Sequence, residues 1–243
     1  MQGAMTPERW TEFGYKLCAI PPGSKKPMGR EWHQHAVPPE RFNRNGMGVI
    51  HGLSGTCAID VDDRALTEQV FESFDLDLEE MIQGTFSWEG RPGRVKLLYQ
   101  RPNLIETRIR KLTKGKHPDV HEVFALRGAE SPQKAAQDVL PPTIHPDTGE
   151  PYRCLTEPRA VEDLPLPPKA ICEMWQGWDE FKPLLAVLIG DECLIKKRRT
   201  KPPSEGAIDL VYRFNTQFPV DEVLERNGYE RQGRRWLRPG SES

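Results

Sequence analysis

Three features that the sequence lacks already narrow the class of protein. No apolar stretch approaches the length of a membrane span, and the N-terminus has no signal-peptide apolar region, so we expect no membrane partner. The five cysteines are an odd number without a CxxC pair, which argues against a disulfide framework or a structural zinc site. Their use favours a reducing, cytoplasmic setting.

Charge of one sign is not in excess either. The net charge is −2, so the molecule as a whole is not a basic nucleic-acid binder. Local clusters matter more than the sum, and clusters of Lys and Arg lie at residues 25–26, 91–96, 108–116 and 196–201. Taken singly, each cluster is more often a solvated loop than a binding surface.

The most informative run that is present is CAIDVDD at residues 57–63. The period of two in a strand puts Asp60 and Asp62 on the same face. Two neighbouring carboxylates on a buried strand repel each other and are costly to desolvate, and a divalent cation is the usual reason for such a pair. The alternative interpretation is a strand that ends in an Asp-rich turn.

Hydrophobic periodicity divides the 243 residues into two parts. We expect a mixed α/β domain over residues 1–165, then a proline-rich linker at 164–168, then a small helical module over residues 170–243. Strands are expected at 17–20, 47–50, 56–61, 85–88, 94–99, 121–126 and 138–140, with 47–50 and 56–61 forming a hairpin. Helices are expected at 6–13, 66–81, 170–189 and 205–227.

Two further features would complete a metal and phosphate site. Glu122 is a lone acid in an apolar strand pattern, so it is a candidate third ligand, although a surface Glu on an edge strand is the alternative. Arg91, Arg94 and Lys96 flank a glycine turn and can meet triphosphate oxygens, because glycine permits close approach and the side chains supply positive charge. A basic hairpin turn without a ligand is the alternative there.

The order of these motifs carries a resemblance to one family. In chain order they are Lys26-Pro27 with Trp32, a glycine-rich approach at 48–55, Asp60-Val61-Asp62, a glycine turn and strand at 87–99, Glu122, and the loop LPPTIHPDTG at 140–149 followed by Tyr152. Over residues 14–155 the chain resembles the primase-polymerase (prim-pol) domain of the archaeo-eukaryotic primase superfamily, as found in phage and plasmid replication proteins. The joint order is far more specific than any single motif.

The resemblance implies an α/β (α+β) fold, with the catalytic core of that superfamily and its RRM-like sheet, followed by a small helical C-terminal module. It implies template-dependent nucleotidyl transfer in DNA replication, by a DNA primase or DNA polymerase that uses two metal ions. The implied partners are a single-stranded DNA template, a primer strand and dNTP or NTP, with a helicase either fused or separate.

The resemblance also assigns roles to individual residues. Asp60, Asp62 and Glu122 would hold Mg²⁺ or Mn²⁺ and act as the catalytic acids. The implied nucleotide-binding residues are Lys96, Arg94, His145, Arg91, Lys26 and Thr143. Lys196, Lys197, Arg198 and Arg199 are candidate template contacts, with a solvated linker as the equal alternative.

One position departs from the family pattern. The second motif of the family normally ends in a His that contacts nucleotide phosphates, and Lys96 stands where we align it. Lysine still binds phosphate as a point charge. A metal-dependent nuclease with the same acids, and a catalytically inactive single-stranded-DNA-binding replication-initiation module, remain the alternative functions. A Lys two residues after the second acid is typical of the commonest such nucleases, and Val123 and Phe124 follow Glu122 instead.

Overall fold

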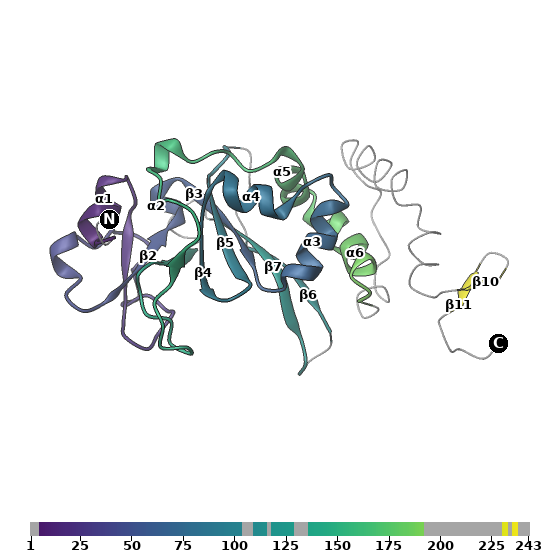
Figure 1. Ribbon diagram of the computed structural model, residues 1–243, viewed down its shortest axis with the longest axis horizontal. Coiled ribbons are helices and arrows are strands. Elements are labelled where there is room, and N and C mark those ends of the chain that lie inside the picture. The colour runs from purple at the N-terminus through teal and green to yellow at the C-terminus, as the bar shows by residue number, and fades with distance from the viewer. Residues whose placement is uncertain are drawn as a thin grey trace.

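The computed structural model describes residues 5–103, 109–115, 118–128, 136–191, 230–232 and 235–237. Two antiparallel sheets and a few short helices make up a mixed α/β fold (Figure 1). Among the described residues, no helix is both long and apolar enough to cross a membrane.

The larger sheet has six strands in the order β6-β7-β3-β5-β4-β9, all antiparallel. Its strands are β3 (Thr56–Val61), β4 (Phe86–Arg91), β5 (Arg94–Gln100), β6 (Arg110–Lys114), β7 (His121–Gly128) and β9 (Arg153–Cys154). The expected strands at 85–88, 94–99 and 121–126 are therefore confirmed, while β6 was expected to be only a basic loop. The acid-bearing strand β3 lies in the middle, between β7 and β5.

A second sheet has three strands in the order β1-β2-β8. They are β1 (Leu17–Ile20), β2 (Gly46–Ile50) and β8 (Gln137–Leu140). The predicted hairpin between residues 47–50 and 56–61 is wrong, because β2 pairs with β1 and β8 whereas β3 belongs to the larger sheet. The short helix α2 (His51–Ser54), closed by Gly55 at φ 66°, redirects the chain from one sheet to the other.

A side chain caps the start of three of the described helices. Thr6 caps α1 (Pro7–Glu12), as expected from the sequence. The single helix predicted at 66–81 is two helices, because Asp75 adopts φ 56° and Asp77 caps a new start. These are α3 (Arg64–Glu72) and α4 (Leu78–Gly84), and the later helices are α5 (Lys169–Gln176) and α6 (Trp178–Leu188), with single 3-10 turns η1 (Pro39–Arg41) and η2 (Val161–Asp163).

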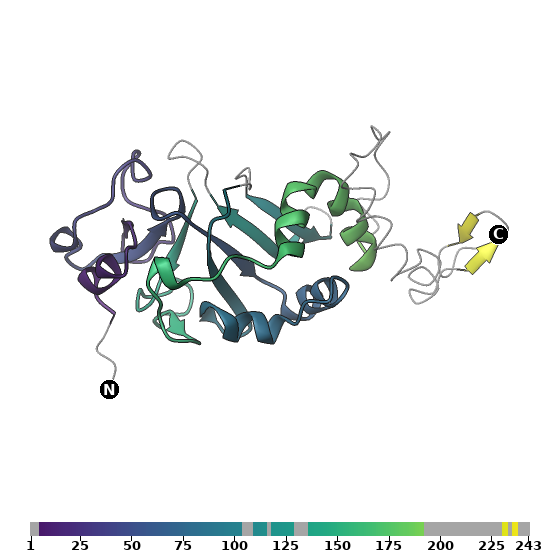
Figure 2. The same ribbon diagram turned by 90° about the horizontal axis from the view of Figure 1, so that it is seen from above.

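The six-stranded sheet carries a hydrophobic core on each of its faces. On one face Ile59, Val61 and Phe124 pack with residues of α3, α4, α5 and α6. On the other face Ala58 and Trp88 pack with residues of the three-stranded sheet. Figure 2 shows α1 and the α5–α6 pair toward opposite ends of this arrangement. The sheet is therefore buried on both faces over most of its area.

The predicted helical module is not confirmed. Residues 169–188 are helical as α5 and α6, but they share a core with the large sheet. The strands β10 (Glu230–Gln232) and β11 (Arg235–Leu237) form an antiparallel pair further along, which the prediction did not include. The helix expected at 205–227 lies outside the described residues.

Candidate active site

Three carboxylates converge where β3 and β7 run side by side. Asp60 lies in β3, Asp62 directly follows that strand, and Glu122 lies near the start of β7. One carboxylate oxygen from each residue lies within 4.8 Å of the other two. All three side chains are half-buried, at 16%, 22% and 21% exposure respectively. The structure thus brings together the three acids that the sequence singles out.

A β-bulge places Glu122 on the same face as Asp60. In the pairing of β6 with β7, Leu112 lies opposite Phe124 and Thr113 opposite Glu122, so Val123 is the extra residue. Val123 and Phe124 both pack into the helix-side core, and Glu122 consequently turns to the other face. The Val123 carbonyl accepts hydrogen bonds from the backbone N–H groups of Asp62 (3.0 Å) and Asp63 (2.9 Å), which fixes the end of β3 beside Glu122.

Each acid of the triad has a basic partner. Lys96 Nζ lies 2.5 Å from Asp60 Oδ2, and Arg94 Nη1 lies 2.9 Å from Asp62 Oδ1. Lys111 Nζ from β6 lies 2.6 Å from Glu122 Oε2. The three cations offset the mutual repulsion of the acids. Arg94 and Lys111 are about half exposed, at 51% and 48%, whereas Lys96 is 16% exposed.

A fourth acid, Asp138, was missed by the sequence analysis. It lies on β8, is 2% exposed, and contacts three basic side chains at once. Lys96 Nζ lies 2.9 Å from Asp138 Oδ1, and Arg127 Nε lies 3.0 Å from the same oxygen. His51 Nε2 lies 2.9 Å from Asp138 Oδ2. The sequence did contain one signal for this pair. Arg127 and Asp138 are charged residues that each follow or adjoin apolar residues in a strand, and buried opposite charges are usually paired.

The protonation equilibria of the cluster follow from this arrangement. Burial raises the pKa of Asp62, the Asp60 charge raises it further, and Arg94 opposes both. Burial alone would raise the pKa of Asp138, but Arg127, Lys96 and His51 together lower it well below its usual range. Burial opposes the ammonium of Lys96, yet Asp138 and Asp60 raise its pKa overall. Asp138 and Lys96 are therefore both charged at neutral pH.

The loop at 140–149 packs beside β4, where the His145 ring lies close to Gly90. Its His145 is buried, and Nδ1 accepts a hydrogen bond from the Asp147 N–H at 3.2 Å. Burial lowers the pKa of His145, and the charges of Lys25 and Arg91 lower it further, so its ring is neutral at pH 7. Arg91 and Lys25 both pair with Asp147, Lys25 at 3.1 Å.

Thr143 and Lys26 are the two remaining predicted nucleotide contacts within the described residues. The Met47 N–H donates to Thr143 Oγ1 at 2.7 Å, so this buried hydroxyl holds the loop to β2. Lys26 is exposed, and its neighbour Lys25 is the residue that reaches Asp147. Lys196, Lys197, Arg198 and Arg199, the predicted template contacts, lie outside the described residues.

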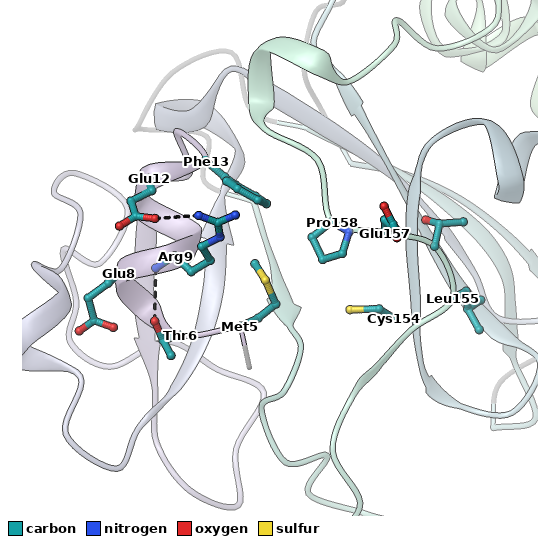
Figure 3. Close-up of a pocket in the computed structure, with 11 residues that line it drawn as sticks. Met5, Thr6, Glu8, Arg9, Glu12, Phe13, Cys154, Leu155, Glu157 and Pro158 are labelled. Carbon is teal, nitrogen blue, oxygen red and sulfur yellow. Dashed lines mark hydrogen bonds and ion pairs between the residues drawn. The ribbon is translucent and has the colours of Figure 1, made fainter. Parts of the chain in front are cut away.

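A separate cavity of about 910 Å³ lies between α1 and the segment that follows β9 (Figure 3). Phe13, Leu155 and Pro158 contribute apolar surface to it. Arg9 lies over the Phe13 ring and pairs with Glu12 at 3.2 Å. None of the predicted site residues lines this cavity, so it is distinct from the acid triad.

Comparison with known families decides the assignment that the motifs suggested. The sequence model described as "Prim-Pol: Bifunctional DNA primase/polymerase, N-terminal" matches residues 8–167. The chain belongs to the Prim-Pol family. No curated protein matches the chain.

Membership of the Prim-Pol family implies DNA primase or polymerase activity in replication, with DNA and nucleotides as substrates. Prim-Pol proteins generally use divalent metal ions. The triad fits such an ion, because three carboxylates offer the hard oxygen ligands that Mg²⁺ and Mn²⁺ prefer, and their partial exposure leaves access from solvent.

Proposed function

We propose that the chain performs template-dependent nucleotidyl transfer in DNA replication, as a DNA primase, a DNA polymerase or both. Asp60, Asp62 and Glu122 would hold two divalent ions, Mg²⁺ or Mn²⁺. The observation that carries this proposal is the approach of their three carboxylate oxygens to within 4.8 Å of one another inside a Prim-Pol domain. The proposed substrates are a single-stranded DNA template, a primer strand and dNTP or NTP.

The side chains around the triad have distinct tasks in this proposal. When bound, the ions would lower the pKa of the attacking 3′-hydroxyl and stabilise the charge on the triphosphate. The acids would fix the positions of these groups, since positioning and charge neutralisation supply most of the acceleration. Arg94, which is half exposed beside Asp62, would neutralise phosphate oxygens, and so would Arg91, which is paired with Arg94 in the register of β4 and β5. His145 lies close to Gly90 of β4.

Finer features of the family belong to the proposal as well. The strand order β7-β3-β5-β4, with α3 and α4 following β3, supports an RRM-like sheet. In chain order, the element that the structure describes between β5 and β7 is the strand β6. Template contacts by residues 196–199 rest on their positive charge, a cytoplasmic location rests on the cysteine usage, and a helicase partner rests on the resemblance alone.

The proposal is tested by a double substitution of the acids on β3. We expect Asp60→Ala/Asp62→Ala to abolish both primer synthesis and primer extension while the far-UV circular dichroism stays unchanged. The assay supplies a labelled template with dNTPs or NTPs, with and without primer, in Mg²⁺ and in Mn²⁺. A matched control is Glu72→Ala/Glu80→Ala, which removes two exposed acids from α3 and α4. Near-normal extension by the first variant would falsify the proposal.

The same assay separates the alternative functions. Shortening of the labelled strand in the presence of metal, without extension, would indicate a nuclease. Strand binding without any metal-dependent nucleotide binding by calorimetry would indicate an inactive single-strand-binding module.

A further inference from the structure

Asp138 joins the two sheets at the point where Asp60 lies. Asp60 is on the central strand β3, Lys96 lies directly opposite it on β5, and Arg127 projects from β7 on the other side. Asp138 comes from β8 of the three-stranded sheet and contacts both of these bases. Two cations from the strands flanking Asp60 thus meet a single buried acid from the opposing sheet.

Both cations are shared between the two acids. Lys96 Nζ lies 2.5 Å from Asp60 and 2.9 Å from Asp138. Arg127 lies 3.8 Å from Asp60 through Nη1 and 3.0 Å from Asp138 through Nε. The Asp138 carboxylate is itself held in one orientation, since its second oxygen contacts His51, whose other ring nitrogen lies 2.9 Å from Thr56 Oγ1.

This sharing has a consequence for divalent cations at the triad. A lysine ammonium on Asp60 competes with a metal ion for that carboxylate, and an arginine nearby adds to the repulsion. Asp138 places a compensating negative charge beside both bases. Asp138 can offset the charge of Lys96 and Arg127 because it lies close to both of them. This effect requires no contact between Asp138 and the triad.

We propose that Asp138 is a positioning residue for the metal site: it holds Lys96 and Arg127 beside Asp60 and offsets their charge, so that a divalent cation can bind Asp60. The inference rests on the proposed function, since it concerns the same acid triad. It also gives Lys96 a task different from that of the family histidine, because its ammonium is a partner of two carboxylates before any phosphate arrives.

Two substitutions are expected to change the Mn²⁺ affinity in opposite directions. Asp138→Asn leaves the Lys96 ammonium to Asp60 alone, so we expect Mn²⁺ affinity to fall about tenfold. Lys96→Met removes the competing cation, so we expect Mn²⁺ affinity to rise by about the same factor. In the double variant the two charge changes cancel, and we expect an affinity within about threefold of the unmutated chain.

These changes in Mn²⁺ affinity are tested by binding Mn²⁺ to the full chain in the absence of nucleotide and DNA. Electron paramagnetic resonance of the free ion measures the binding. Lys169→Met is the matched control, because it removes a lysine paired with Glu173 on α5. Thermal melting is recorded for every variant. A purely structural Asp138 would lower the melting temperature of Asp138→Asn and leave the Mn²⁺ affinity of the folded protein unchanged, which would overturn the inference.

The remaining outcomes are also decisive. If Asp138→Asn does not fold, Lys96→Met decides the matter, and unchanged or weaker Mn²⁺ binding by that variant overturns the inference. If the unmutated chain extends primers and binds Mn²⁺, but the Mn²⁺ affinities of the variants do not change in the expected directions, the inference fails while the proposed function stands. If the unmutated chain neither binds Mn²⁺ nor extends primers, the proposed function fails first.

Discussion

At the scale of single residues, basic side chains of the same chain form ion pairs with the acids of the triad and stabilise them. Lys96, Arg94 and Lys111 come from strands other than those that carry their acid partners. Each pair therefore also links neighbouring strands. Because each acid has its own basic partner, the repulsion among the three half-buried carboxylates at the strand ends is reduced.

Gly90 permits the loop at 140–149 to approach β4. A Cβ atom at this position would overlap ring atoms of Tyr152 and His145. We therefore expect Gly90→Ala to lower the free energy of unfolding by about 1–3 kcal/mol, measured by urea denaturation. Gly84→Ala is the control, because a Cβ there meets no atom within 4 Å, and we expect a change within about 0.5 kcal/mol. Equal effects of the two substitutions would contradict the packing argument.

Buried thiols give a pH-dependent prediction. Burial raises the pKa of Cys18 to about 12 and also raises that of Cys57. These thiols favour the folded state fully below the unfolded pKa of about 8.5, and that contribution is lost as pH rises toward the folded value. We expect iodoacetamide at pH 8 to modify the half-buried Cys154 and to spare Cys18 and Cys57 until denaturant is added. Peptide mass mapping is the measurement, and rapid native labelling of Cys18 would contradict it.

At the scale of elements, two indole groups fasten the small sheet and the segment after it to the rest of the fold. Trp88 Nε1 on β4 donates to the Val139 carbonyl on β8 at 2.8 Å. Trp10 Nε1 on α1 donates to the Pro141 carbonyl at 2.9 Å. Both indoles are buried, so these bonds form away from competing water. They hold β8, and with it Asp138, at a fixed distance from the large sheet.

Replacing one of these indoles should weaken the junction between the sheets. We expect Trp88→Phe to lower the free energy of unfolding by about 2 kcal/mol, since a buried hydrogen bond and part of the ring volume are lost. Trp32→Phe is the control, because Trp32 is only partly buried at the edge of the same core. Chemical denaturation measures both. A larger loss for Trp32→Phe than for Trp88→Phe would show that the indole bond is unimportant.

The sequence predicted the individual strands well, since apolar runs with turn residues between them mark β1, β4, β5 and β7. It was less informative wherever contacts between distant segments decide. The false hairpin of β2 with β3 arose because adjacency in the chain does not reveal that α2 sends the two strands into different sheets. Asp75, with its positive φ, split a helix that periodicity alone had joined.

The candidate site shows the same division. Asp60, Asp62 and Glu122 were predicted from local pattern and motif order, and they do converge. The bulge at Val123, which turns Glu122 toward Asp60, depends on pairing with β6. Asp138 and Arg127 were missed because their importance lies in a contact between two sheets. The roles of all these residues in catalysis remain predictions.

At the scale of the whole molecule, α5 and α6 complete the core of the large sheet. Trp178 contacts Phe124 of β7 with ring centroids 6.1 Å apart, and Phe181 contacts Phe74 at 5.8 Å. Ile171 and Trp175 are buried in the same cluster. The family match nevertheless ends at residue 167, before these helices begin. The division into domains at 165–170 therefore passes through a continuous hydrophobic core.

Two truncated chains test whether that division is a folding boundary. A fragment of residues 1–167 loses every apolar contact from α5 and α6, so we expect it to bind the dye ANS and to melt without a cooperative transition. A fragment of residues 1–191 retains both helices, and we expect it to melt cooperatively within a few degrees of the full chain. Calorimetry and dye fluorescence measure these outcomes. Cooperative melting of the shorter fragment at the temperature of the longer one would instead make residues 1–165 an independent domain, because the large sheet would then be stable without the helices that cover it.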